Sequence, residues 1–162
     1  MTTLQKLVSL DALARALERD RAAGCSIALA NGLFDLLHVG HLRYLEGAKA
    51  EADRLVVAVN SDASARALKG PTRPVVPQQE RAELLAGFAC VDYVIVFEEQ
   101  NVEPLLRRLR PDVHCKGTDY TASTVPEREV AHALGVRVAI VGDPKEHATR
   151  AIIERLREPR ED

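Results

Sequence analysis

The sequence predicts an α/β protein built on a single doubly wound, five-stranded parallel sheet. Five short apolar runs alternate with longer segments whose apolar residues recur at helical spacing. One run, residues 54–60, is a continuous valine-rich series, as expected of a parallel strand buried on both faces. Strands and helices that alternate in this way form right-handed βαβ units, which build a parallel sheet covered on both sides.

Each element is justified by its own local pattern. Residues 1–23 are predicted to be an N-terminal helical lead-in, one helical segment over 2–23, with Ser9 as N-cap and Gly24 as stop. Residues 63–77 hold three prolines and scattered cations and are predicted to be a mobile loop, while residues 158–162 are a charged tail expected to fray. The strands are expected at 26–30, 54–60, 93–97, 113–115 and 136–141, and the other helices at 42–52, 78–88, 102–109, 124–134 and 148–157.

Length and composition indicate one domain spanning residues 1–162. A net charge of −2 and the lack of a basic cluster make nucleic acid an unexpected partner. No run approaches the roughly 18 apolar residues that a membrane span requires, so no membrane association is expected. Three widely spaced cysteines, Cys25, Cys90 and Cys115, favour free thiols in a reducing cytoplasm.

The chemically richest stretch is the corner at residues 31–41, which joins the first strand to the following helix. In open α/β sheets the ligand crevice lies outside the carboxyl ends of the strands. His38 and His41 are three residues apart and share a face at the first turn of a helix. A helix start offers N–H groups and partial positive charge, and Gly40 has no side chain to block a ligand. The corner therefore predicts a phosphate site.

The corner also contains a recognisable motif, G-x-F-D-x-x-H-x-G-H, made by Gly32, Phe34-Asp35, His38 and Gly40-His41. The full motif resembles the nucleotidyltransferase superfamily of the cytidylyltransferase type, which joins a phosphate-bearing acceptor to a nucleoside monophosphate. This resemblance implies a Rossmann-like nucleotidyltransferase fold. A structural turn with two solvent-facing histidines stays an alternative. So does a zinc site, although zinc needs three or four ligands. An NAD or FAD enzyme is disfavoured because no G-x-G-x-x-G follows a strand.

The resemblance extends over most of the chain. The order of further motifs is similar to the adenylyltransferase of ADP-heptose synthesis, the partner half of a two-domain heptose-phosphate kinase/adenylyltransferase. It implies that ATP and D-glycero-D-manno-heptose 1-phosphate give ADP-heptose and pyrophosphate, for the lipopolysaccharide core or a related surface glycan. A homodimer and a separate heptose-phosphate kinase are implied as well. The matching segments are residues 59–64, 68–70, 73–74, 81, 91–92 and 116–120.

The chemistry of the corner and the family resemblance together predict a role for each candidate site residue. The catalytic group is expected to be His38, His41 and Lys69, which would stabilise the phosphates and the transition-state charge. Mg²⁺ is expected to arrive with ATP, held mainly by substrate oxygens and water. The acceptor is expected to contact Asp35, Arg73 and Asp119, with orientation of the corner or contact with a metal-bound water as further roles for Asp35. The nucleotide is expected to contact Asn31, Gly32, Leu33, Phe34, Gly40, Arg81, Lys116, Gly117, Thr118, Thr149 and Arg150.

Two departures from the family pattern bear on the substrates. Ala148 stands where a serine is common at the start of the last helix, and Thr118 stands where a second glycine is common. One rival within the enzyme class is a cytidylyltransferase for glycerol 3-phosphate or a related alcohol phosphate. A rival outside it, motivated by Ala148, is a catalytically silent nucleotide-binding module.

Overall fold

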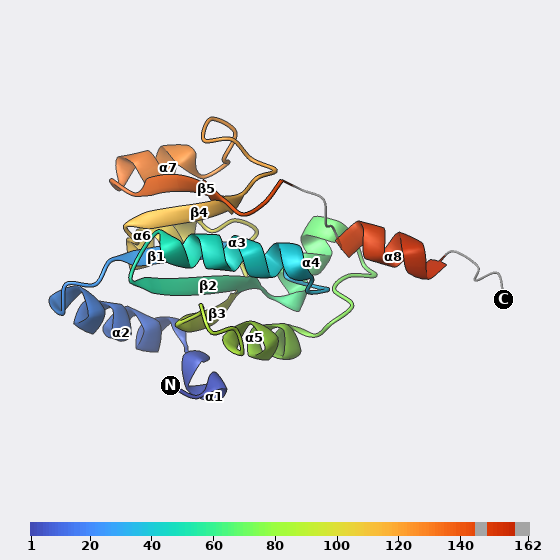
Figure 1. Cartoon of the computed structure of the whole chain (residues 1–162), viewed down its shortest axis with the longest axis horizontal. Coiled ribbons are helices and arrows are strands. Elements are labelled where there is room, and N and C mark those ends of the chain that lie inside the picture. Colours follow the sequence, from blue (N-terminus) through green and yellow to red (C-terminus); the bar gives the residue numbers. More distant parts are fainter. Residues whose placement is uncertain (145–148, 158–162) are drawn as a thin grey trace.

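The computed structural model describes residues 1–144 and 149–157, and its centre is a sheet of five parallel strands. Their order is β3-β2-β1-β4-β5, so the chain winds outward from β1 first in one direction and then in the other (Figure 1). This is the doubly wound sheet predicted from the sequence. The strands are β1 (Ile27–Gly32), β2 (Arg54–Asn60), β3 (Tyr93–Phe97), β4 (Val113–Gly117) and β5 (Arg137–Val141).

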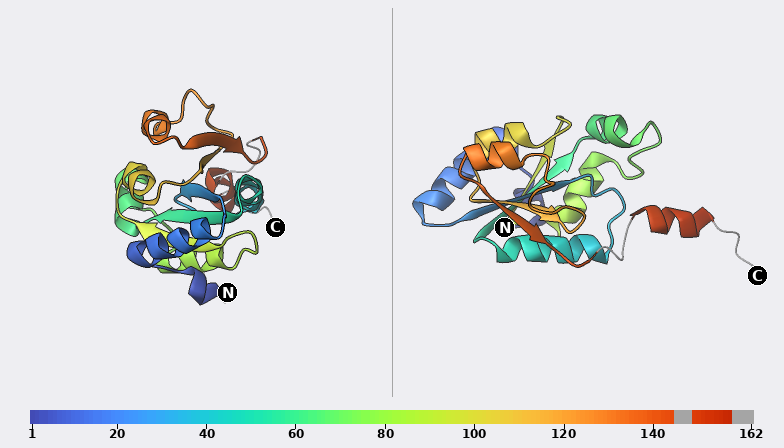
Figure 2. Two further views of the ribbon diagram at one scale, coloured as in Figure 1. Left: turned by 90° about the vertical axis from the view of Figure 1, so that its left-hand side faces the viewer. Right: turned by 90° about the horizontal axis from the view of Figure 1, so that it is seen from above.

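Helices cover both faces of the sheet, and Figure 2 shows the layers from two further sides. Helices α3 and α5 bury apolar side chains against one face, and α2, α6 and α7 bury theirs against the other. Helix α8 lies beyond the carboxyl ends of the strands, away from these layers (Figure 1). The helices are α1 (Thr3–Lys6), α2 (Leu10–Ala22), α3 (Val39–Ala50), α4 (Asp62–Lys69), α5 (Gln78–Ala86), α6 (Glu103–Leu109), α7 (Arg128–Ala133) and α8 (Thr149–Arg157).

The central strands are apolar because both of their faces are covered. In β2, every side chain from Leu55 to Val59 is fully buried. Burying one valine or leucine side chain contributes about 1.5–3 kcal/mol to folding, so this strand is a main source of stability. The strand pairs β1 with β2 and β1 with β4 bring the carboxyl ends of β1, β2 and β4 to one edge of the sheet.

Two predicted segments differ in kind from the structure, and the helix predicted at 124–134 is shorter, since α7 runs only from Arg128 to Ala133. Residues 2–23 form two helices because the chain between them pairs with the edge strand: the Val8 N–H donates to the Val94 carbonyl at 3.1 Å. Ser9 then caps α2, its Oγ accepting from the Ala12 N–H. Residues 63–69 belong to α4 rather than to a loop, because the Ser61 Oγ accepts from the Ser64 N–H at 3.1 Å and starts a helix there. The predicted loop shrinks to residues 70–77.

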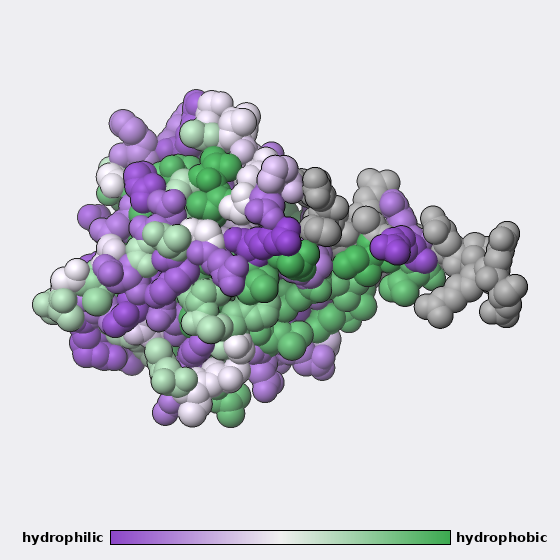
Figure 3. All heavy atoms as spheres, in the orientation of Figure 1, coloured by the Kyte–Doolittle hydropathy of each residue, from purple (hydrophilic) through white to green (hydrophobic). Residues whose placement is uncertain are grey.

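The surface combines polar and apolar areas. Apolar side chains gather around the start of α3 on the face shown in Figure 3. Within the described ranges, every helix is too short or too polar to cross a membrane. The large apolar residues exposed in the described part of the chain include Val39, Leu68, Val75, Leu84 and Leu156.

Candidate active site

A crevice of about 1350 Å³ opens at the carboxyl edge of the sheet, between β1 and β4, where the winding direction reverses. Ligands bind at such switch points in doubly wound folds. A smaller, mainly apolar hollow of about 730 Å³ lies along edge strand β3 and contains none of the predicted site residues. Predicted residues that line the large crevice are Asn31, Gly32, Leu33, Phe34, Asp35, His38, Gly40, His41, Lys69, Arg73, Lys116, Gly117, Thr118 and Asp119.

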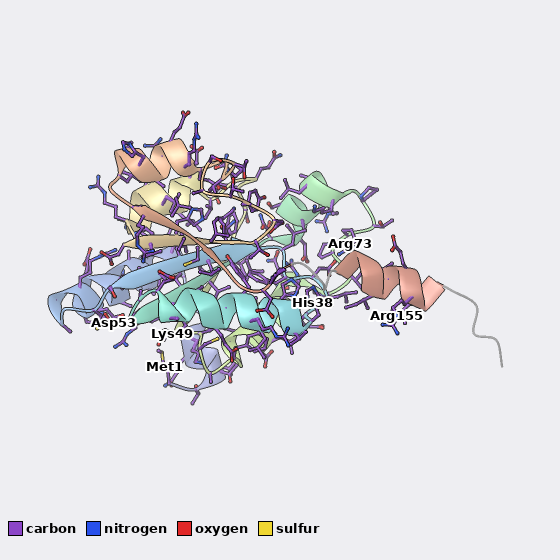
Figure 4. The ribbon with its side chains drawn as sticks, turned by 45° about the horizontal axis from the view of Figure 1, so that its top comes forward. Met1, His38, Lys49, Asp53, Arg73 and Arg155 are labelled. Atoms are coloured by element: carbon purple, nitrogen blue, oxygen red, sulfur yellow. The ribbon has the colours of Figure 1, made fainter. Side chains whose placement is uncertain are left out.

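The two histidines meet at the first turn of α3, as their spacing predicted. His38 is the N-cap residue, and the ring centroids of His38 and His41 are 3.9 Å apart. The backbone N–H of His38 donates to Nδ1 of His41 at 3.3 Å. His41 therefore carries its proton on Nε2 when neutral, and this nitrogen is a hydrogen-bond donor. Figure 4 shows His38 at the end of α3 that faces the crevice.

The surroundings of His41 favour the neutral form of its ring. Burial, with a smaller effect from neighbouring His38, lowers the pKa of His41 from 6.5 to about 4. The ring of Phe34 packs edge-on against His41 with centroids 5.5 Å apart, which fixes the plane of the imidazole. Phe34 has a φ of +50°, and a Cβ on Gly32 would lie 3.2 Å from its ring, so a larger residue at position 32 would press against the ring that packs on His41. A bound polyphosphate would favour protonation of the histidine pair.

Asp35 is buried beneath the crevice and holds the 70–77 loop. Its Oδ2 accepts from Nε of Arg73 at 2.6 Å, and its Oδ1 accepts from the N–H groups of Val75 and Val76 at 2.8 and 3.0 Å. Only 4% of Asp35 is exposed, so these contacts leave little of its carboxylate for an acceptor. Asp35 thus shapes the loop, and Arg73 is engaged in the same pair. The predicted contacts of both residues with the acceptor stay predictions.

Lys69 stands in the last turn of α4 rather than in a loop, and its side chain is exposed at the crevice. The neighbouring Gly70 has a φ of +99°, which ends the helix and lets the chain turn toward Asp35. Because Lys69 belongs to a helix, its backbone is held more rigidly than it would be in the predicted loop. The ammonium group remains on a flexible stem of four carbons.

Arg81 lies under the crevice, fully buried in α5. Its guanidinium donates to the carbonyl oxygens of Leu33 and Val76 and to Oδ1 of Asp62, the last at 2.8 Å. These partners come from the corner after β1, the 70–77 loop and the start of α4. The guanidinium has no exposed surface and joins these three segments, and its predicted contact with the nucleotide stays a prediction.

The end of β4 forms the opposite wall and includes a residue that the sequence reading missed. Lys116 is 7% exposed; its Nζ lies 3.4 Å from Oε2 of Glu127 and 4.8 Å from the centre of the Tyr120 ring. Glu127 is 4% exposed and also lines the crevice. In the sequence it appeared only as a helix-start glutamate after Pro126, and nothing local distinguished it.

The loop after β4 is pinned to the loop after β5. The Thr118 hydroxyl donates to the Asp143 carbonyl oxygen at 2.6 Å, and the Asp143 carboxylate accepts from Arg43 of α3 at 2.6 Å. A Cβ on Gly117 would lie 2.9 Å from Oδ1 of Asp119, so a larger residue at position 117 would require the Asp119 carboxylate to shift. Through Asp143, the loop after β4 is therefore connected to the loop after β5 and to α3.

The last helix borders the crevice through Ile153, Glu154 and Leu156. Thr149 and Arg150, both predicted to meet the nucleotide, begin α8, and their side chains lie outside the described residues. Ala148 and the expected frayed tail at 158–162 lie outside the described ranges altogether.

No group of three or more His, Cys, Asp or Glu side chains among the described residues could hold a metal ion. The Asp35 carboxylate, which lies in the corner motif, is occupied by Arg73 and two backbone N–H groups. Residues 1–144 and 149–157 therefore do not fit a metal held by the protein alone.

Comparisons with known proteins agree with this geometry. A family model described as cytidylyltransferase-like matches residues 29–155. The chain is 45% identical to bifunctional protein HldE of Syntrophotalea carbinolica, covering 90% of this chain and 30% of that protein. It is 46% identical to the protein of the same name from Geobacter sulfurreducens, covering 93% and 31%, and 48% identical to that from Acidiphilium cryptum, covering 95% and 32%. The chain thus spans about 30% of the length of these curated relatives.

A solved structure shares the architecture. The crystal structure of the lipopolysaccharide core biosynthesis protein from Thermoplasma volcanium GSS1 has a TM-score of 0.64 and 28% identity, covering 75% of this chain and 100% of that chain. The family match includes most of β1, the histidine corner, Lys69 and the β4 wall, which together surround the crevice. The chain belongs to the cytidylyltransferase-like family.

Proposed function

We propose that the protein is an adenylyltransferase that joins AMP from ATP to D-glycero-D-manno-heptose 1-phosphate, giving ADP-heptose and pyrophosphate. The single observation that carries the chemistry is the pair of imidazoles 3.9 Å apart at the N-terminus of α3, inside the crevice at the sheet's switch point. The choice of ATP and heptose is supported by the motif order at 59–64 and 116–120 and by the relatives named HldE.

In the proposed reaction, an oxygen of the acceptor phosphate attacks the α-phosphorus of ATP, and the bond to the pyrophosphate oxygen breaks. The attacking oxygen is already ionised near neutral pH, so no general base is needed. The protein's task is to position the substrates and stabilise charge. His41 suits this task because its neutral ring presents Nε2–H as a donor, and a bound phosphate would favour its protonation.

Lys69 supplies the mobile positive charge in this proposal. It reaches the crevice from α4, while Arg73 is tied to Asp35 at 2.6 Å. We therefore assign the β- and γ-phosphates to Lys69 and give Arg73 mainly a loop-holding role. The opposite wall, with Lys116, Thr118 and Asp119, faces the nucleoside or the acceptor.

Mg²⁺ would enter on the triphosphate, coordinated by substrate oxygens and water, since the described residues offer no carboxylate cluster for it. When bound, the ion would neutralise phosphate charge. The residues of this chain would position the substrates around it.

Three further proposals concern the setting of the enzyme. A heptose-phosphate kinase that supplies the sugar phosphate is proposed from the family resemblance. A homodimer is proposed from the family resemblance; the exposed apolar side chains near the start of α3 are compatible with it, and light scattering would measure the mass in solution. A cytoplasmic location fits an ATP-dependent enzyme whose three cysteines are free thiols.

Pyrophosphate release tests the proposal. Purified protein is assayed with ATP or CTP against heptose 1-phosphate and glycerol 3-phosphate. Release with ATP and heptose 1-phosphate is the expected result. Turnover with CTP and glycerol 3-phosphate would replace it by the cytidylyltransferase alternative. Nucleotide binding without release for any pair would identify a silent module.

A further inference from the structure

A buried histidine on β4 contacts the crevice indirectly. His114 is fully buried, and its Nε2 lies 3.0 Å from Oδ1 of Asn31. Asn31 lies near the carboxyl end of β1 and lines the crevice. Leu29 pairs with His114 across the two strands, so Asn31, two residues further on, projects from the same face of the sheet. The arrangement links the core to the substrate site through one side chain.

The surroundings of His114 determine which nitrogen carries its proton. Nδ1 has no hydrogen-bond partner among the described residues. A proton on Nδ1 would therefore be a buried donor without an acceptor, a costly arrangement that proteins avoid. A proton on Nε2 is satisfied by Asn31. Burial and the charge of nearby Lys116 also keep the ring neutral by lowering its pKa to about 3. The neutral tautomer with Nε2–H is the one that this site supports.

The tautomer of His114 determines which way the side-chain amide of Asn31 is oriented. Because Nε2–H of His114 donates, it must meet the amide oxygen, and the NH₂ group of Asn31 is turned away from the ring. None of the described residues accepts a hydrogen bond from that Nδ2, although Asn31 lines the crevice. Its two N–H bonds are therefore available to a ligand. A flipped amide would present an oxygen instead and would repel phosphate oxygens.

We propose that His114 is a positioning residue: it orients Asn31 so that the amide Nδ2 donates to an oxygen of a bound substrate, either in the triphosphate of ATP or in the sugar phosphate. The inference rests on the proposed function for the identity of these substrates. Lys116 lies on the same strand face two residues beyond His114, and its ammonium group, 3.4 Å from the Glu127 carboxylate, is the cation of this wall.

The first test reads the tautomer without any turnover. Long-range ¹⁵N–¹H spectra of the full chain labelled at histidine should show His114 as a neutral Nε2–H ring at pH 6–7, assigned by its loss in His114→Gln. A neutral Nδ1–H ring or an imidazolium would overturn the proposal. Titrating ATP and then heptose 1-phosphate should shift the Asn31 side-chain NH₂ signals with one of the two. No shift with either would also overturn it. These readings stand even if the protein has no adenylyltransferase activity.

The second test is a double-mutant cycle in steady-state kinetics. His114→Leu should raise the KM of one substrate about five- to ten-fold, the loss expected for one oriented hydrogen bond. His114→Gln, which keeps an N–H donor for the Asn31 oxygen, should restore most of that loss. A raised KM for ATP would place the contact on the triphosphate, and a raised KM for the sugar phosphate would place it on the acceptor.

The cycle separates orientation from general damage to the core. If His114 acts through Asn31, then His114→Leu should add nothing to the KM already raised by Asn31→Ala. Fully additive losses, or an equal loss in His114→Gln and His114→Leu, would overturn the positioning role. Should His114→Leu not fold, the spectra and the His114→Gln kinetics still decide, because Gln lacks a ring but keeps the donor.

Discussion

Replacing His114 should remove a specific pH dependence from the free energy of unfolding. Burial, together with the charge of Lys116, lowers the pKa of His114 from 6.5 to about 3 in the native state. In the unfolded chain the solvated imidazole takes up a proton near pH 6.5. Between these two values the unfolded state binds more protons than the native state. The stability linked to a neutral His114 is therefore complete above pH 6.5 and is lost as the pH falls.

The size of the effect follows from the two pKa values. Lowering the pH from 7 to 5 charges the unfolded imidazole almost completely while the buried ring stays neutral, which lowers the free energy of unfolding by about 2 kcal/mol. His114 is fully buried, so solvent screening does not reduce this figure. A domain of this size has about 5–15 kcal/mol of stability in total, and a change of 2 is easily measured.

Urea titrations of the wild type and His114→Gln at pH 5, 6 and 7 give the comparison directly. His41, whose pKa is also lowered, contributes a similar trend to both proteins, so the difference between their pH profiles isolates His114. His132→Gln, a change at an exposed histidine of α7, is the matched control and should retain the wild-type profile. Identical pH profiles for the wild type and His114→Gln would refute the claim that the buried ring is neutral.

Three further predictions address the site. His41→Ala should lower kcat by about 10²–10³ with little change in the thermal midpoint, since it removes a donor aimed at transition-state charge; wild-type turnover would eliminate that role. Lys69→Ala should raise the KM for ATP about ten-fold or more, whereas Arg66→Ala, in the same turn of α4 but outside the crevice lining, should not; equal effects would argue against a directed contact. Asp35→Ala should speed proteolytic cleavage within residues 70–77 and raise the KM for ATP, because three hydrogen bonds to that loop are lost; an unchanged cleavage rate would show that the loop is held by other contacts.

The sheet was predictable because its signals are local. Residues 54–60 and 93–97 were assigned as strands with the bounds that β2 and β3 have. The continuous apolar run of β2 needs no knowledge of its neighbours, since a strand covered on both faces has no polar side to show. The pairing of His38 with His41 was predictable for the same reason, because three residues of helix always bring two side chains to one face.

Helix α4 was missed because prolines and cations in residues 63–77 outweighed a weaker local signal. Ser61 begins an alanine-containing segment, and its Oγ caps the helix by accepting from Ser64. Giving more weight to Ser61 as an N-cap would have predicted the helix, which ends at Lys69 before the first proline. His114 and Glu127 had no comparable local signal. Their roles depend on Asn31 and Lys116, which approach them only in the folded chain.

Asp35 and Arg81 show that charged residues beside the crevice can serve to hold its surrounding segments. Asp35 is almost fully buried and Arg81 is fully buried. Asp35 connects the corner to the 70–77 loop, and Arg81 connects both of these segments to the start of α4 at Asp62. A buried charge is stable only when its hydrogen bonds are satisfied, and here protein groups satisfy them. Lys69, exposed at the crevice, keeps its ammonium group available. Burial and satisfied hydrogen bonds thus give Asp35 and Arg81 a structural role beside the crevice, whereas exposure leaves Lys69 able to reach a ligand.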